Sequence, residues 1–399
     1  MVKHIVICAA AALGACMPAF PDDSGKDDTG AASTPSSGAC GSGTWQPGWL
    51  EIHHIDAGEA VSTLIVSPVG KTMLIDAGEA AWDRSDGALR IGDYLRNVLG
   101  CSHLDYVVLS HFHVDHTGFP GWGGLWHLAL QQGFSVGKLL HRDLYRFVGA
   151  SGATLDAWRE FLQSPEASAL SPTIALLGTG QVELGGGVDF AFVAVDGNGQ
   201  LPAGDFSSDS APPDENDYSI AITLRMGRFD YFSAGDLSGR TSRKSGYSYH
   251  DLETGLAPIV KDVDVYRVSH HGSAYASNGT WLAQIDPEVS IVEVADGNPN
   301  GHPAQSTVDR LAATSALYLT EHGDPSTNLL GGKVIGDVVV RTANGIDYTV
   351  GGDTFVASDP QRTDRDGDGY FVEADPDDSA ALVVPLPNGG CDETYQACP

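Results

Sequence analysis

The feature that most constrains the fold of this 399-residue chain is a dense run of metal-ligand side chains directly after a predicted strand. The apolar segment 106–109, Tyr-Val-Val-Leu, has the length and the β-branched content of a buried strand. It is followed at once by His111, His113, Asp115 and His116. Imidazole nitrogens and carboxylate oxygens together suit Zn²⁺ and similar divalent ions, and a polar loop rarely carries this many by chance. The stretch therefore predicts a metal site at the end of a strand.

Polar side chains also follow other predicted strands. The residues placed in this way are Asp76, Asp236, His270, His271 and His302. Because strand ends at one edge of a sheet converge in space, these distant positions can share one site with the histidine run. Each residue alone would be an ordinary turn residue, so the prediction depends on their order and on their common position.

Strands alternate with amphipathic helices in both halves of the chain. Segment 88–99 is predicted to be a helix that ends at Gly100, with Leu89, Ile91 and Leu95 among its inward residues. The alternation predicts two sheets covered on their outer faces by helices, which is a four-layer α/β body.

The polar segments are similar, in their order, to the motifs of a known superfamily. IDAG at 75–78, SHFHVDH at 110–116, AGD at 234–236 and SHHGS at 269–273 resemble the successive motifs of the metallo-β-lactamase superfamily. ENDYS at 215–219 and NGHP at 300–303 narrow the resemblance to the soluble hydrolase domain of ComEC-type DNA-uptake proteins, and more loosely to phosphorylcholine esterases of the same fold. The resemblance covers about residues 50–350 and implies an αββα sandwich and a metal-dependent hydrolase.

The resemblance also implies a role for each motif residue. The implied metal ligands are His111 and His113 for a first ion, Asp115 and His116 for a second, Asp236 as a bridge, and one of His270 and His271 to complete the second site. The implied substrate-facing residues are the other histidine of that pair, His302, Asn216 and Ser273. Asp115 or Asp236 would orient the attacking water, and Asp76 would hold the histidine loop in place from behind.

One departure from the superfamily pattern concerns the first metal. Many members carry a histidine in the loop before the strand that starts near Ser219, where this chain has Glu215, Asn216 and Asp217. The first ion is therefore short of a nitrogen ligand, and the expected cofactors are two Zn²⁺ ions with Mn²⁺ as the alternative. Such a centre suits a phosphodiester or a carbonyl substrate equally well.

The resemblance favours an exported hydrolase that cleaves phosphodiester or related ester bonds with a metal-activated hydroxide. Two alternatives stay open, a lactonase or β-lactamase-type hydrolase and a non-catalytic surface binding protein. The net charge of −30 disfavours extended nucleic acid as a partner, and a small molecule or phosphodiester is the expected substrate. A locally basic groove would change this, and its candidate residues are Arg225, Arg228, Arg240, Arg243, Lys244 and Arg267.

The N-terminal segment is typical of an exported protein. Residues 1–16 are predicted to be a signal peptide, and LGAC at 13–16 resembles a lipobox that would place a lipid on Cys16. The alternative is ordinary signal-peptide cleavage. Residues 17–47 are predicted to be a flexible linker, and 48–357 the hydrolase domain. The expected location is periplasmic or on the outer membrane or cell surface, with membrane contact only through the lipid anchor.

The acidic tail, residues 358–399, contains a predicted calcium loop. The residues at loop positions 1, 3, 5, 7 and 12 are Asp364, Asp366, Asp368, Tyr370 and Asp375. An aspartate replaces the usual glutamate at position 12, as in other extracellular calcium loops, and the alternative is a disordered acidic tail. Cys391 and Cys398 could pair in an oxidising compartment, and pairing of Cys40 with Cys101 is possible but has no support in the sequence.

Overall fold

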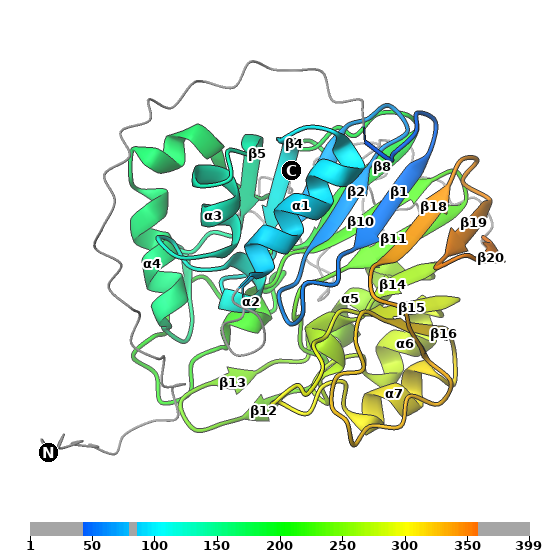
Figure 1. Cartoon of the computed structure of the whole chain (residues 1–399). Helices are drawn as coiled ribbons and strands as arrows, with labels where there is room; N and C mark the ends of the chain where they lie inside the picture. Colours follow the sequence, from blue (N-terminus) through cyan, green and yellow to red (C-terminus); the bar gives the residue numbers. More distant parts are fainter. Residues whose placement is uncertain (1–42, 80–85, 358–399) are drawn as a thin grey trace, which may run out of the picture. The chain divides into compact units, whose positions relative to one another are not determined.

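Two β-sheets pack face to face, with helices on both outer faces, in the computed structural model of this chain (Figure 1). The structure describes residues 43–79 and 86–357. The predicted signal peptide, most of the predicted linker, the calcium loop and the pair Cys391 and Cys398 lie outside the described residues. Within the described residues, no helix is long and apolar enough to cross a bilayer.

The first sheet has nine strands in the order β20-β19-β18-β1-β2-β3-β4-β5-β7. Their bounds are β1 (Leu50–His54), β2 (Thr63–Val66), β3 (Thr72–Ile75), β4 (His103–Leu109), β5 (Ser135–His141), β7 (Pro172–Ile174), β18 (Val338–Thr342), β19 (Asp347–Val350) and β20 (Asp353–Val356). β1 pairs with β18 across nearly 300 positions of sequence, so the C-terminal strands complete a sheet that the N-terminal strands begin.

The second sheet has seven strands in the order β17-β16-β15-β14-β11-β10-β8. Their bounds are β8 (Val188–Ala194), β10 (Ala221–Met226), β11 (Phe229–Ser233), β14 (Val265–Arg267), β15 (Val289–Val292), β16 (Ala316–Leu319) and β17 (Lys333–Val334). The remaining strands form two small ribbons, β6 (Phe147–Val148) with β9 (Gly204–Asp205), and β12 (Ser242–Arg243) with β13 (Ser248–Tyr249).

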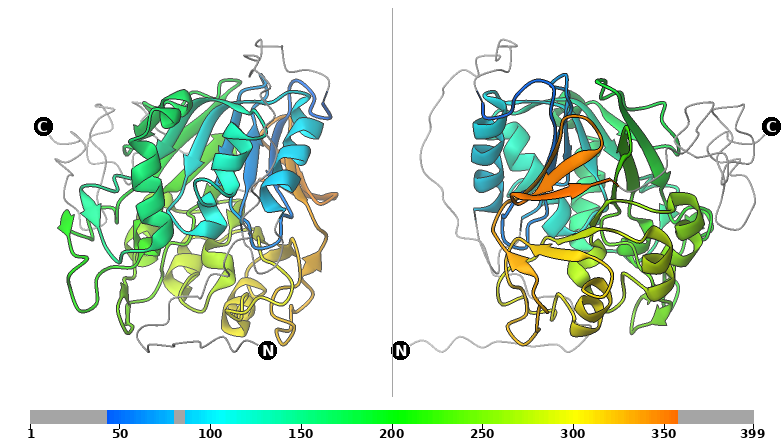
Figure 2. Two further views of the ribbon diagram at one scale, coloured as in Figure 1. Left: turned by 60° about the vertical axis from the view of Figure 1, so that its left-hand side comes forward. Right: turned by 90° about the vertical axis from the view of Figure 1, so that its right-hand side faces the viewer.

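The helices lie outside the sheets, as the two side views show (Figure 2). Their bounds are α1 (Gly87–Leu99), α2 (Val114–Thr117), α3 (Gly124–Leu130), α4 (Ala153–Leu162), α5 (Glu253–Val260), α6 (Gly279–Ile285) and α7 (Gln305–Leu311). Three short 3₁₀ turns are η1 (Glu166–Leu170), η2 (Glu215–Tyr218) and η3 (Ser269–Gly272).

Three apolar clusters fill the three interfaces between the four layers. One lies between the sheets and includes Ile52 and Ile222, one joins the first sheet to α1, α3 and α4, and one joins the second sheet to α5, α6 and α7. The predicted four-layer αββα sandwich is therefore confirmed. The prediction that Leu89 faces inward is wrong, because its side chain is 49% exposed while Ile91 is fully buried. Two positions correspond to about 200° around a helix, so Leu89 lies on the opposite face.

The candidate site residues follow the carboxyl ends of parallel strands in both sheets. β3, β4 and β5 run parallel in the first sheet, and β11, β14, β15 and β16 run parallel in the second. The residues that follow these strands are Asp76 after β3, His111 after β4, Asp236 after β11, His270 after β14 and His302 after β15. Both sheets thus direct their strand-end loops to one common edge.

The described residues before β1 pack against the first helix. The backbone N–H groups of Thr44 and Trp45 donate to Asn97 and Val98 at the end of α1. Cys101 is disulfide-bonded, and its partner lies outside the described residues.

Candidate metal centre

The histidine run folds into a tight loop against the segment that follows β3. The N–H of Ala77 donates to the carbonyl of His116 at 2.9 Å. A Cβ atom on Gly78 would lie 1.7 Å from the carbonyl oxygen of Asp115, so only glycine permits this approach. The Asp-Ala-Gly motif therefore forms the surface on which the histidine loop rests.

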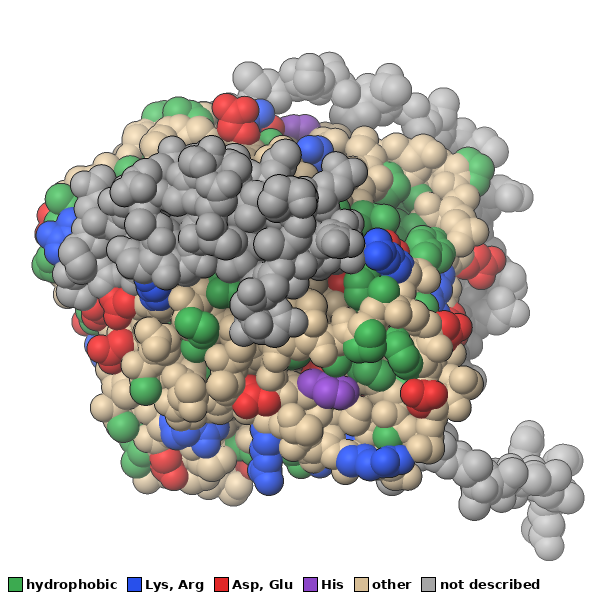
Figure 3. Space-filling view, turned by 180° about the vertical axis from the view of Figure 1, so that it is seen from behind, with side chains coloured by type: hydrophobic (Ala, Val, Ile, Leu, Met, Phe, Trp, Pro, Cys, Tyr) green, Lys and Arg blue, Asp and Glu red, His purple; other side chains and the backbone are tan. Residues whose placement is uncertain are grey.

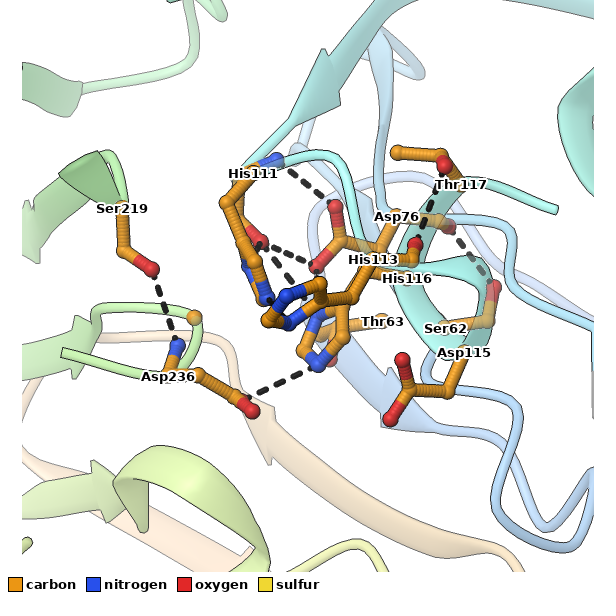
Figure 4. A network of polar contacts seen from close by, with 12 residues as sticks. Ser62, Thr63, Asp76, His111, His113, Asp115, His116, Thr117, Ser219 and Asp236 are labelled. Atoms are coloured by element: carbon orange, nitrogen blue, oxygen red, sulfur yellow. Dashed lines mark hydrogen bonds and ion pairs between the residues drawn. The ribbon is translucent and has the colours of Figure 1, made fainter. Parts of the chain in front are cut away.

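Asp76 holds this loop through three hydrogen bonds (Figure 4). Its carboxylate accepts from the Ser110 N–H at 2.7 Å, from the Ser110 hydroxyl at 2.6 Å and from Nδ1 of His116 at 2.8 Å. Because Nδ1 of His116 donates to Asp76, Nε2 keeps its lone pair for another partner. The hydrogen bond between Asp76 and Nδ1 of His116 is the kind of contact by which Asp76 would hold the histidine loop in place.

The metal-ligand side chains come together from both sheets. Two groups of three residues have ligand atoms within 4.8 Å of one another, namely His111 with His116 and Asp236, and Asp115 with His116 and His271. Nε2 of His116 lies 3.0 Å from Oδ1 of Asp236, and Nε2 of His271 lies 3.3 Å from Oδ2 of Asp115. Asp236 faces the histidine loop from the opposite side (Figure 4).

The grouping differs in detail from the division that the resemblance implies. His116 belongs to both groups, and His113 belongs to neither. Nδ1 of His113 lies 3.1 Å from Nε2 of His111, so its ring still borders the first group. His113 also lines the cavity beside the centre.

The geometry separates the two neighbouring histidines of η3. Nδ1 of His271 donates to the carbonyl of Glu293 at 2.9 Å, which leaves Nε2 directed at Asp115 and Asp236. Nε2 of His270 lies 3.3 Å from the side-chain amide of Asn216 and, like that of His271, 3.7 Å from Oδ2 of Asp236, so the contact with Asp115 is what distinguishes His271. Both histidines have left-handed backbone conformations, with φ of 55° and 50°, and this turn directs consecutive side chains to different partners.

Buried charges tune the protonation of the centre. Burial would raise the pKa of Asp236, but His116 and His270 outweigh it and hold that pKa well below its usual range. Burial lowers the pKa of His270 to about 4 and that of His302 to about 3. The pKa of His271 rises to about 9, because Glu59 and Asp236 outweigh burial. The ionised carboxylate of Asp236 therefore lies beside the neutral imidazoles of His270 and His302, and a cation bound there would displace the proton that the neighbouring carboxylates favour on His271.

In the loop before β10, acidic residues occupy the region in which the superfamily pattern has a histidine. The Glu215 carboxylate accepts the N–H of Phe112, between two site histidines, at 3.0 Å, and it forms a buried ion pair with Arg142. Asp214 lines the cavity, and burial raises its pKa to about 6 against the opposing effect of His113. The loop at 197–218 contains no histidine, so it supplies no imidazole ligand to the centre. Glu215 supports the histidine loop instead, and Asp214 supplies a carboxyl group on the His113 side.

A cavity of about 360 Å³ opens beside the centre. Predicted residues in its lining are His113, Asp115, Asn216, Asp236, His270, His271, Ser273 and His302. Lining residues that sequence reasoning missed are Glu59, Asp214, Tyr247, Tyr249, Tyr275 and Asn300. A carboxylate directly after Ala57-Gly58 was the only signal that could have indicated Glu59, and the tyrosines carry no motif.

The residues present fit a divalent metal. Nε2 of His116, Oδ1 of Asp236 and Nε2 of His271 are buried and make no well-aligned hydrogen bond within the described part of the chain. Nε2 of His116 faces Oδ1 of Asp236 at 3.0 Å and Nε2 of His271 faces Asp115 at 3.3 Å, so lone pairs oppose lone pairs unless a proton or a cation lies between them. Mixed nitrogen and oxygen donors suit Zn²⁺ or Mn²⁺.

No protein-family model and no curated protein sequence matches this chain. Among solved structures, the chain is similar to CmlA, a diiron β-hydroxylase from Streptomyces venezuelae, at 12% identity over 73% of this chain and 54% of that one, with a TM-score of 0.38. It is also similar to a diphosphatase from the PhnP family (13% identity, 71% and 84% covered, TM-score 0.34) and to a long form RNase Z from yeast (12% identity, 63% and 38% covered, TM-score 0.31). The chain thus spans about half the length of CmlA. These similarities are too distant to assign a family.

Proposed function

We propose that this chain is an exported metal-dependent hydrolase that cleaves phosphodiester or related ester bonds. The observation that carries the proposal is the convergence of buried nitrogen and oxygen ligand atoms from both sheets, without well-aligned hydrogen bonds, beside a cavity of about 360 Å³. A binding protein has no need for ionised, water-orienting carboxylates in such a position. The motif resemblance supports hydrolysis in addition.

Residues of the chain hold the metals and the substrate in this proposal. The metal ligands would be His111, His113, Asp115, His116, Asp236 and His271. When bound, the metal ions would activate a water molecule and stabilise charge on the attacked and leaving oxygens. Asp115 and Asp236 orient the water, and Asp76 keeps His116 in the tautomer that binds through Nε2.

The reaction adds water across one ester bond. The water oxygen forms a bond to phosphorus, the bond from phosphorus to the leaving oxygen breaks, and that oxygen departs with a proton as an alcohol. His270 and His302 stay neutral and face the cavity, where they can hydrogen-bond the substrate. Asn216 and Ser273 line the same cavity.

The experiment compares metal content and turnover of the purified protein with those of His116→Ala. Because His116 belongs to both ligand groups, the variant should lose bound metal and at least about a hundredfold of its turnover of bis(p-nitrophenyl) phosphate. His127→Ala is the matched control, since His127 lies on α3 and does not line the cavity. Metal content by elemental analysis and full turnover retained in His116→Ala would refute the assignment.

The same assay separates the alternatives. Hydrolysis of a chromogenic β-lactam or lactone, without hydrolysis of the phosphodiester, would identify a carbonyl hydrolase. Bound metal with no turnover of any of the three substrates would identify a binding protein.

Export is proposed from the N-terminal segment alone. Incorporation of labelled lipid into the full chain, and its loss in Cys16→Ser, would test the proposed anchor.

A further inference from the structure

A short hairpin, residues 240–249, lies beside the metal centre. β12 and β13 pair through Ser242 with Tyr249 and Arg243 with Ser248, and the N–H of Lys244 donates to the Tyr247 carbonyl to close the turn. Contacts to the preceding loop fix the hairpin, including the bond from the Ser248 N–H to Pro212 at 2.8 Å. The hairpin therefore forms one side of the cavity and is fixed in place by these hydrogen bonds.

Three tyrosine rings meet on this wall. Tyr247, Tyr249 and Tyr275 all line the cavity that holds the metal centre. The ring of Tyr249 lies 5.4 Å from that of Tyr247, 5.1 Å from that of Tyr275 and 6.0 Å from that of His270. Tyr247 and Tyr275 are only half-buried, so parts of their rings stay accessible to a ligand. We name these three residues the tyrosine wall.

The tyrosine wall differs in character from the rest of the cavity. The other lining side chains are carboxylates, imidazoles, amides and one hydroxyl. Polar groups of this kind serve a metal and a hydrolysable ester, whereas aromatic rings offer flat apolar surfaces on which another ring can stack.

The hairpin also brings positive charge to an acidic protein. Arg240, Arg243 and Lys244 form no ion pair with a carboxylate in the described part of the chain, although the whole chain has a net charge of −30. The Lys244 ammonium group donates to the Tyr275 hydroxyl and lies 4.1 Å from the centre of that ring, and Arg240 lies 5.7 Å from it. Basic side chains also lie along the lower edge of the face seen in Figure 3.

We propose that the tyrosine wall binds a planar aromatic group carried by an anionic ester, so that the enzyme prefers aryl or nucleoside phosphodiesters over alkyl ones. The aromatic group stacks on the tyrosines while the phosphoryl group lies at the metal centre, and Lys244 neutralises charge at the wall. This inference rests on the proposed function, because it names the substrate class of the same site.

Equilibrium binding tests the inference without turnover. Phenylphosphonate and methylphosphonate carry the same anionic head but differ in the aromatic ring, and neither has an ester bond to hydrolyse. Calorimetry on the full chain as purified should show phenylphosphonate binding at least about tenfold more tightly. Thymidine 5′-phosphate against deoxyribose 5-phosphate gives the nucleoside counterpart, and the larger of the two ratios shows whether the natural group is a nucleobase or a simple aryl ring.

Variants locate the effect. Tyr247→Leu should bring the ratio of the two phosphonate affinities close to one, and Tyr247→Phe should keep it, because the ring rather than the hydroxyl stacks. Tyr249→Leu is a second variant on the same wall. Tyr145→Leu is the control, since this exposed tyrosine does not line the cavity.

Three outcomes would overturn the inference, namely equal affinity for the two phosphonates, no binding of either, or a preference that survives both leucine variants. The proposed function can fail separately. Tyrosine-dependent binding without hydrolysis of any diester would contradict the hydrolase and leave the tyrosine wall standing. Hydrolysis of the diester without an aromatic preference would support the hydrolase and contradict the role of the tyrosine wall.

Discussion

Asp76 combines an unusual backbone conformation with a key side-chain contact. Its φ is +61°, in the left-handed region that aspartate and asparagine tolerate better than most residues. This conformation turns the carboxylate toward Ser110 and His116. The residue therefore connects a local turn requirement to the orientation of a metal ligand.

Asp76→Asn should weaken metal binding while keeping the fold. Asparagine tolerates the backbone conformation, but its amide lacks the charge that stabilises the donor state of His116 Nδ1. Second-sphere changes of this kind typically cost about 10–100-fold in metal affinity. Competition with a fluorescent chelator measures the affinity, and circular dichroism checks the fold.

Asp93→Asn is the matched control for this prediction, because Asp93 lies on α1 with a largely exposed side chain. Equal metal affinities for Asp76→Asn and Asp93→Asn would show that the contact to His116 has no influence on the metal.

At the scale of elements, Glu293 ties four strand ends together. Its carboxylate accepts from Nδ1 of His54 at 2.8 Å and from the Thr63 hydroxyl at 2.7 Å, at the ends of β1 and β2. It also pairs with Arg267 of β14 at 3.3 Å. Because its backbone carbonyl accepts from His271, this network connects both sheets to the metal centre.

Glu293→Gln should destabilise the protein strongly. The substitution leaves the fully buried guanidinium of Arg267 without its counter-charge, and breaking a buried pair in this way costs about 3–5 kcal/mol. Urea denaturation at pH 7 measures the free energy of unfolding. The double variant Glu293→Gln/Arg267→Met should lose less than the sum of the two single variants, since the pair is removed together. Additive losses would show that the pair is not coupled.

The pH dependence of this network has a definite sign. Burial would raise the pKa of Glu293, but Arg267 and the hydrogen bond from His54 lower it from 4.5 to about 2. A lowered pKa in the folded state stabilises the protein above the unfolded value, and this stabilisation is lost as the pH falls through the folded value. The stability difference between wild type and Glu293→Gln should therefore shrink between pH 4.5 and pH 2. A constant difference over this window would contradict the assignment.

The motifs show how far sequence reasoning reaches at this scale. The ligand motifs could be predicted because they lie in the loops that follow β4, β11 and β14, and the local pattern marks a strand end. Glu293 could not be predicted, because its partners His54 and Thr63 lie more than 200 positions away. Leu89 was assigned to the wrong face because apolar character alone does not fix a position around a helix.

At the scale of the whole molecule, the metal centre links the two sheets. His111 and His116 follow a strand of the first sheet, while Asp236 and His271 follow strands of the second. A ligand that bridges these loops binds the folded state and not the unfolded chain, so its binding stabilises the entire sandwich.

Removal of the metal should lower the melting temperature. At a free metal concentration one hundred times Kd, binding contributes about 2.7 kcal/mol, which corresponds to a shift on the order of 5 °C for a body of this size. Differential scanning calorimetry with and without EDTA measures it. His116→Ala should melt at the same temperature in both conditions, and an EDTA effect as large as that of wild type would contradict the link.

The structure shows where the six candidate basic residues lie relative to the cavity. Of the six basic residues that the sequence offered for a substrate groove, Arg267 is buried against Glu293 and Arg225 lies 3.8 Å from Asp230. Arg228 lies in the β10–β11 turn. On the hairpin, Arg240 and Lys244 lie against the ring of the cavity residue Tyr275, which favours a local anion site over a continuous basic groove.

The sequence by itself predicted the layered fold and the strand-end positions of the polar motifs, because periodicity and motif spacing are local properties that survive without knowledge of contacts. Only the tertiary structure decided that His271 rather than His270 points at Asp115, that Glu215 supports the histidine loop, and that three tyrosines form one wall. These facts depend on side-chain directions set across two packed sheets. A one-residue difference in a turn exchanges the partners of neighbouring side chains, and no local pattern records which partner lies opposite.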